Sequence, residues 1–184
     1  MTRRTGSLVL GALAMMVLAS PTQAQTTPFV FFGGGASIAT GEYKDYAKTG
    51  WLANAGVGAN IGDKGLWVAA DLFYGSNKHS DVTGEKTNLM IGLATIGYNF
   101  MPAAKVTPYV HGSVGLLNHA YRSTQFPTSN GSQNLIAFGG GAGLLIKLGA
   151  KSSFWVEGRY LTGSKSGSTT SFIPVMAGVS IDLK

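Results

Sequence analysis

Strict alternation between apolar and small or polar residues is the feature that most constrains how this chain can fold. In residues 51–62, apolar side chains from Trp51 to Ile61 occupy every second position, with leucine, asparagine or glycine between them. A period of two places alternate side chains on opposite faces of a β-strand, whereas an amphipathic helix requires a period near 3.6. The alternation recurs in four further segments, residues 65–75, 134–148, 153–162 and 172–183. We therefore predict an all-β fold.

Three more segments, residues 28–39, 87–100 and 105–118, are predicted strands whose two faces are less clearly separated. The first contains three consecutive glycines and the second is apolar on both faces. A β-bulge or a change of face is therefore an open alternative in either. Long helices are disfavoured by the 27 glycines among 184 residues. The predicted total is eight strands.

The lengths of the connections indicate which kind of β-protein this is. Long connections at residues 40–50, 76–86, 119–133 and 163–170 alternate with short ones at residues 63–64, 101–104 and 149–152. Outer-membrane barrels keep this parity, with short periplasmic turns and longer external loops, and their tilted strands need about ten residues to cross the bilayer. A soluble sandwich or lipocalin-like barrel does not require this alternation of long and short connections. We predict an eight-stranded antiparallel up-and-down transmembrane β-barrel.

Residues 1–24 are predicted to be a signal peptide that is removed on export. Two N-terminal arginines precede an apolar run over residues 8–19, and Thr22 and Ala24 are the small residues that favour cleavage after Ala24. The run is shorter than the roughly 20 residues that a membrane-spanning helix needs. Residues 25–184 are then the outer-membrane barrel domain. Their lysines are scattered rather than clustered, so nucleic-acid binding is not expected.

Three stretches of the chain resemble a known family. They are residues 107–115 (Thr-Pro-Tyr-Val-His-Gly-Ser-Val-Gly), 155–160 (Trp-Val-Glu-Gly-Arg-Tyr) and 177–181 (Ala-Gly-Val-Ser-Ile). They are similar to strands of the small, porin-family outer-membrane β-barrels, which include the opacity-type proteins and the transmembrane domain of outer-membrane protein A. The resemblance implies a place in the outer membrane of a Gram-negative-type bacterium. The chain departs from these barrels at Leu183 and Lys184, where the family usually ends on an aromatic residue.

His111 and Ser113 raise the alternative of an enzyme that modifies lipid A, because ester chemistry needs a serine and a histidine. The two residues point the same way on one predicted strand. If Val110 and Val114 face lipid, however, His111 points into the lumen, beyond the reach of a lipid ester. We therefore expect no enzymatic activity and predict no catalytic, cofactor-binding or metal-binding residues.

A narrow channel is the second alternative. Eight strands enclose an interior just wide enough for side chains to fill. The predicted lumen residues include Trp67, Phe73, Tyr109 and Trp155, whose bulk would block diffusion. The expected role is therefore structural, or a surface interaction such as adhesion, carried by the external loops on a rigid scaffold.

The longest predicted loop, residues 119–133, holds the contact candidates. Tyr121, Arg122 and Phe126 are residue types common at binding hot spots. The expected partners are outer-membrane lipid and lipopolysaccharide, together with an unidentified ligand on a host surface or another envelope protein. The barrel is expected to be a monomer.

A charged cluster is expected inside the barrel. The alternation places Asp71, Glu157 and Arg159 on inward faces, and counting from the short turns sets Asp71 opposite Gly56 and the other two opposite the glycine-rich residues 141–145. The third and seventh strands lie on opposite walls of an eight-stranded ring, so the arginine can pair with a carboxylate from either wall. We predict that this cluster plugs the lumen. The alternative is that the three charges are hydrated at the rim.

Overall fold

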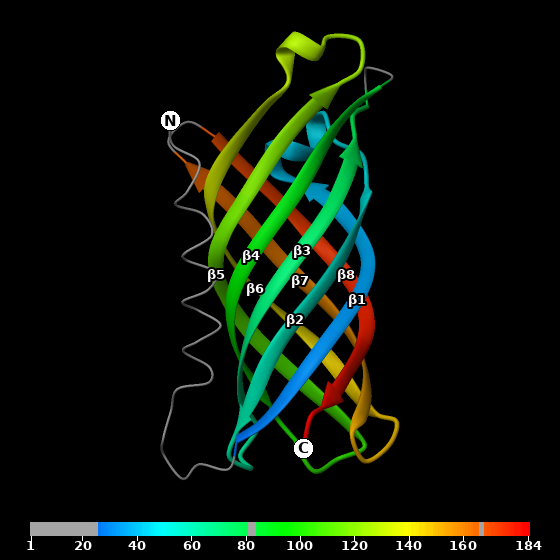
Figure 1. Ribbon diagram of the computed structural model, residues 1–184, viewed down its shortest axis with the longest axis vertical. Helices are drawn as coiled ribbons and strands as arrows, with labels where there is room; N and C mark the ends of the chain where they lie inside the picture. The colour runs from blue at the N-terminus through cyan, green and yellow to red at the C-terminus, as the bar shows by residue number, and fades with distance from the viewer. Residues whose placement is uncertain (1–25, 81–83, 166–167) are drawn as a thin grey trace.

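The chain forms a closed barrel in the computed structural model, which describes residues 26–80, 84–165 and 168–184 (Figure 1). Each strand pairs antiparallel with its sequence neighbours, and β1 closes the ring against β8. The strands are β1 (Thr26–Thr40), β2 (Gly50–Ile61), β3 (Leu66–Lys78), β4 (Glu85–Asn99), β5 (Val106–Ser123), β6 (Gly131–Lys147), β7 (Ser152–Lys165) and β8 (Ser168–Asp182). The predicted eight-stranded antiparallel barrel is confirmed. The predicted signal peptide, residues 1–24, lies outside the described residues.

Two short 3-10 helices, η1 (Gly41–Asp45) and η2 (Pro127–Ser129), lie in connections at one end of the barrel, here called the loop end (Figure 1). The opposite, turn end carries the connections β2–β3, β4–β5 and β6–β7. The β2–β3 turn is tight because Gly62 and Gly65 adopt positive φ angles of 66° and 92°, which cost glycine little. No helix within the described ranges is long and apolar enough to cross a membrane.

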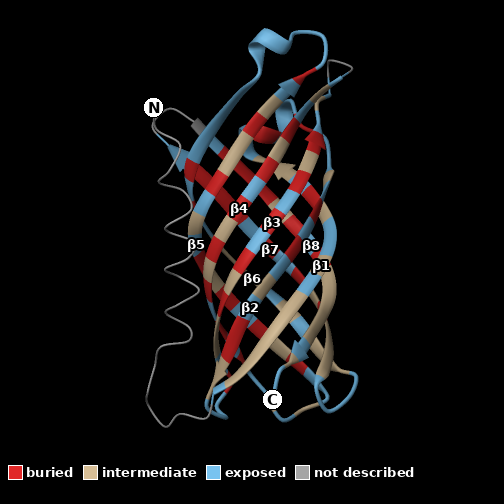
Figure 2. Ribbon diagram, viewed as in Figure 1, coloured by how far each residue is buried: buried red, intermediate tan, exposed pale blue. Residues whose placement is uncertain are grey.

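Buried and exposed residues alternate along the strands, as Figure 2 shows. On β3, Leu72 and Tyr74 are exposed on the outside while Asp71 and Phe73 are buried in the lumen. Large apolar side chains cover the outer surface in every strand, and aromatic pairs stand near both of its edges, Trp51 with Tyr74 and Tyr98 with Phe100. An apolar band between aromatic girdles is the outer surface that lipid requires.

The two strands with ambiguous faces run without a bulge. The pairings of β1 with β2 and of β4 with β5 continue residue by residue from end to end. On β4, Met90 and Ile96 point outward, whereas Leu89, Ile91 and Leu93 are buried inside. This strand is apolar on both faces because its inner face forms part of the hydrophobic core.

The loops are shorter than predicted, and two contact candidates are not in a loop. β5 and β6 stay paired up to Tyr121 and Gly131, so the connection after β5 spans residues 124–130, and Tyr121 and Arg122 belong to β5. Likewise β7 and β8 pair up to Lys165 and Ser168. The prediction was wrong because it ended each strand where apolar alternation stopped. Beyond the apolar band, pairing still satisfies backbone N–H and C=O groups, and outward side chains there are polar.

The hydrophobic core fills the lumen toward the loop end. It contains buried side chains from all the strands around the ring except β1, among them Leu52, Phe73, Leu89, Ile91, Leu117, Leu135, Leu161 and Phe172. Tyr43 of η1 caps this core: it is fully buried, and its ring centroid lies 5.8 Å from that of His119. Burial raises the pKa of Tyr43, so the phenol stays neutral in this position.

Candidate functional site

Inward-facing glycines determine where the charged side chains lie. Asp71 of β3 pairs with Gly56, and Glu157 and Arg159 of β7 pair with Gly143 and Gly141, which is the register expected from the short turns. A Cβ atom at Gly143 would lie 2.6 Å from the phenol of Tyr109, and one at Gly141 would lie 2.8 Å from Nε2 of His111. The glycines thus leave room for β5 side chains beside the acid and the arginine.

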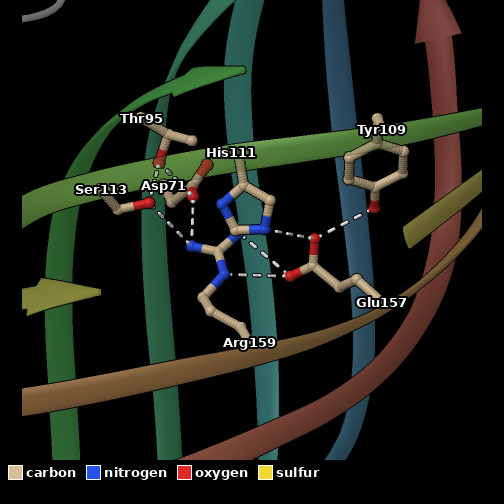
Figure 3. Close-up of polar contacts among 7 residues, drawn as sticks. All are labelled: Asp71, Thr95, Tyr109, His111, Ser113, Glu157 and Arg159. Carbon is tan, nitrogen blue, oxygen red and sulfur yellow. Dashed lines mark hydrogen bonds and ion pairs between the residues drawn. The ribbon is translucent and has the colours of Figure 1, made fainter. Parts of the chain in front are cut away.

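Arg159 spans the lumen between two walls of the barrel (Figure 3). Its Nη1 donates to Oδ2 of Asp71 at 3.0 Å, and its Nη2 lies 3.0 Å from Oε1 of Glu157. The Arg159 side chain is only 3% exposed, and its Cζ lies 5.1 Å from the ring centroid of Phe73. The structure therefore brings the three predicted charges together as a buried network, not as hydrated groups at the rim. Such pairs are tolerated inside a protein because each charge meets an opposite one.

Polar residues of β4 and β5 complete this network. Thr95 Oγ1 donates to Asp71 Oδ2 at 3.0 Å and lies 2.9 Å from Ser113 Oγ. On the other side, Tyr109 donates its hydroxyl to Glu157 Oε2 at 3.0 Å, and His111 Nε2 lies 3.4 Å from the same oxygen. The alternation along β4 places Thr95 on the inward face, so this residue could have been identified from the sequence. Its partner Asp71 could not, because that requires the register between β3 and β4.

His111 and Ser113 are not arranged as a base and a nucleophile. Ser113 contacts Thr95 and lies 3.5 Å from Nη1 of Arg159, while His111 faces Glu157. Both side chains are buried inside the barrel, away from the lipid-facing surface. No group of three or more histidine, aspartate or glutamate residues in the described part of the chain could hold a metal ion.

A cavity of about 460 Å³ lies between the charged network and the turns. We call it the turn-end cavity. Its deep end is formed by Asp71, Glu157 and Arg159, and its mouth by Gly62, Asp63 and Pro102 of the turns. The hydrophobic core and η1 lie beyond the network, so the described residues close the lumen toward the loop end.

The contact candidates at the loop end do not form one patch. Tyr121 packs its ring 5.3 Å from that of His79, and Arg122 is exposed and donates to the carbonyl oxygens of Tyr121 and Gly131. Phe126 is 59% exposed in the connection between β5 and β6, which rises above the rest of the barrel (Figure 1).

The register reveals a second feature at this end that sequence reasoning missed. Lys78 of β3 pairs with Lys86 of β4, and Lys86 pairs with Arg122 of β5. All three are exposed, and they form a lateral row of cations on the outer surface, here called the basic row. Lys78 and Lys86 are eight residues apart on consecutive strands, whereas Arg122 lies 36 residues further along the chain, so the register of three strands is needed to bring all three together.

A family model for the outer membrane protein beta-barrel domain matches residues 10–180. This chain belongs to that family. As an outer-membrane barrel of a Gram-negative-type bacterium, it presents its apolar outer face to lipid. In such barrels the short turns face the periplasm and the longer loops face outward, so the turn-end cavity is periplasmic and the basic row is extracellular.

Solved outer-membrane barrels share this fold at low sequence identity. Neisserial surface protein A (NspA) is 19% identical with a TM-score of 0.68, and the match covers 85% of this chain and 97% of that one. The N-terminal β-barrel domain of Pseudomonas aeruginosa OprF is 17% identical with a TM-score of 0.53, covering 87% and 98%. Ail, the attachment invasion locus protein of Yersinia pestis, is 15% identical with a TM-score of 0.53, covering 88% and 100%. No curated protein matches the chain.

Proposed function

We propose that this barrel is a non-enzymatic surface-interaction protein whose extracellular end binds saccharides that carry phosphate or sulfate groups. The basic row is the observation that carries the proposal. Like charges placed directly opposite each other destabilise paired strands, and here Lys86 has a cation opposite it on both sides. A polyanionic partner would neutralise that repulsion through charge-assisted hydrogen bonds.

The position of the basic row suits such a partner. Lys78 and Lys86 each stand four residues beyond a large lipid-facing side chain, Tyr74 on β3 and Met90 on β4. At about 3.3 Å of strand per residue this displacement is roughly 13 Å. The row therefore lies just above the apolar band, where the sugar and phosphate layer of the outer leaflet begins.

A similar ligand class occurs on a barrel of this fold. Yersinia pestis Ail has been solved in complex with the heparin analogue sucrose octasulfate. In our chain the exposed Arg122, at the base of the protruding β5–β6 connection, would extend contact from the basic row toward Phe126. A surface or adhesion role is favoured over a channel because the hydrophobic core fills the lumen toward the loop end.

The test is binding of the refolded, detergent-solubilised barrel to immobilised heparin and, separately, to lipopolysaccharide. The triple variant Lys78→Ser, Lys86→Ser, Arg122→Ser should bind at least about tenfold more weakly, since each lost charge-assisted hydrogen bond is worth about 1.5 kcal/mol or more. Preference for lipopolysaccharide would indicate the cell's own outer leaflet as partner, and preference for heparin a foreign sulfated surface.

The matched control removes three exposed lysines from the turn end, Lys64, Lys105 and Lys151. It changes the net charge by the same amount and should leave binding unchanged. Equal weakening in both triple variants, or no binding of the unmodified barrel to either ligand, would refute the proposal.

A further inference from the structure

The turn-end cavity has the dimensions of a ligand site. Its volume of about 460 Å³ lies within the usual range for small-molecule pockets, roughly 300–1,000 Å³. It is surrounded by the barrel wall and reached past the turns, so a free molecule from the periplasm can enter it but a lipid embedded in the bilayer cannot.

Five aromatic rings form a band along the wall of this cavity, from β7 through β1 and β3 to β5. Neighbouring ring centroids lie 6.5 Å apart for Trp155 and Phe31, 6.0 Å for Phe31 and Phe29, 6.4 Å for Phe29 and Trp67, and 6.1 Å for Trp67 and Tyr109. The five residues come from β1, β3, β5 and β7, and each of them lies on the inward face of its strand.

Glycines on adjoining strands hold these rings against the wall. A Cβ atom at Gly97 would overlap the indole of Trp67, and Cβ atoms at Gly58 and Gly56 would overlap Phe29 and Phe31. Each ring therefore lies over a neighbouring strand and does not cross the lumen. This is why five large side chains leave a cavity between them and do not fill it.

The cavity is acidic although the chain as a whole is basic. Four acids, Asp63, Asp71, Glu157 and Asp182, and two bases, Lys147 and Arg159, line it, which gives a net charge of −2 against +6 for the whole chain. Arg159 pairs with Asp71 and Glu157 and offsets one of their two charges, and Lys147 Nζ donates to the carbonyl of Pro102 at 2.7 Å, so the acids of the lining outnumber its bases by two. The field in the cavity therefore favours a cation.

Two buried polar groups on the cavity wall have no hydrogen-bond partner. They are Oδ1 of Asn54, an acceptor, and Nε1 of Trp155, a donor; the residues are 6% and 5% exposed. Cross-strand pairing sets them in one row in which only Gly33 and Gly178 stand between them. A hydroxyl group can donate to the first and accept from the second, and leaving such groups unpaired is costly.

We propose that the turn-end cavity binds a small organic ammonium ion that carries a hydroxyl group, a molecule of the amino-alcohol class. The aromatic band would hold the cation through its π faces, the surplus carboxylates would provide the counter-charge, and Asn54 and Trp155 would bind the hydroxyl. The site is distinct from the basic row at the opposite end of the barrel, so a negative result for one site leaves the proposal for the other unaffected.

The experiment compares choline with its neutral isostere 3,3-dimethylbutan-1-ol in octyl glucoside micelles, which contain no ammonium group. Fluorescence is recorded on the Trp51→Phe variant, so that the remaining tryptophans, Trp67 and Trp155, both report on the cavity. Choline should give a saturable change, and the neutral isostere should bind at least about tenfold more weakly, since desolvated cation–π contacts are worth about that factor.

Variants then locate the site. Asn54→Leu should weaken choline binding, whereas the matched Asn88→Leu, which lies at the loop end of β4, should not. A heat-dependent shift in gel mobility verifies that each variant is a closed barrel. The comparison of choline with its isostere uses no substitution in the cavity, so it stays valid even if Asn54→Leu does not fold. No saturable effect of choline, equal binding of the isostere, or an unchanged affinity in folded Asn54→Leu would overturn the proposal.

Discussion

At the scale of single residues, Arg159 is the side chain on which the most interactions depend. It joins β3 and β7 across the lumen by pairing with Asp71 and Glu157, and both carboxylates are buried. A buried ion pair contributes modestly to stability compared with apolar packing, but loss of one member leaves uncompensated charge in a low-dielectric interior. The plug that we propose is thus sensitive to the removal of the single cation shared by two acids.

Arg159→Ala should therefore destabilise the folded barrel by about 3–5 kcal/mol, measured as a lower urea midpoint in lipid vesicles. No conductance should appear in planar bilayers, because the hydrophobic core closes the loop-end half independently.

The matched control is Arg122→Ala, which removes an exposed arginine and should change stability by no more than about 0.5 kcal/mol. An Arg159→Ala barrel as stable as this control would contradict a stabilising role for the buried cluster.

At the scale of elements, each strand separates lipid from lumen by alternation alone. In the middle of β2, Val57 is 45% exposed on the outside, and its cross-strand neighbours Val30 and Ala70 are apolar as well. The outer face needs no specific contact, because lipid tails pack equally well against any apolar side chain. Its requirement is the absence of charge.

Val57→Lys should cost about 2–4 kcal/mol of folding stability in lipid bilayers, since a lysine near the bilayer midplane faces hydrocarbon. Refolding yield and urea midpoint in vesicles provide the measurement. Ser132→Lys, on an exposed part of β6 beyond the apolar band, should cost almost nothing because it faces water. Similar losses in the two variants would mean that Val57 does not contact lipid.

At the scale of the whole molecule, closure between β1 and β8 inverts the usual arrangement of a β-protein. The apolar outer face meets lipid, and the interior combines a hydrophobic core at the loop end, a charged network, and a cavity at the turn end. Closure also removes every unpaired strand edge, which hydrocarbon does not tolerate. The two ends are therefore chemically different.

The orientation can be tested directly because the chain contains no cysteine. Single cysteines at Asp45 and Thr128, in the loop-end connections, should react with a membrane-impermeant maleimide in intact cells. Cysteines at Lys64 and Ala150, in turns, should react only after the outer membrane is permeabilised. The reverse pattern of labelling would place the turns outside and exclude the topology.

The sequence by itself determined the strand count, the faces of the alternating strands and the inward position of Asp71, Glu157 and Arg159. These are local properties, because a period of two and a tight turn act over neighbouring residues. The ends of the strands beyond the apolar band were not determined in this way. Pairing there is favoured by backbone hydrogen bonds, which leave no apolar pattern in the sequence.

Tertiary structure alone decided which distant residues meet. The basic row depends on the register of three strands, and the aromatic band depends on closure of the whole ring, with each large ring lying over a glycine of another strand. It also decided that η1 folds inward to bury Tyr43 over the core. Such placements depend on which long-range contacts form together, and side-chain periodicity along one strand carries no information about its partner across the barrel.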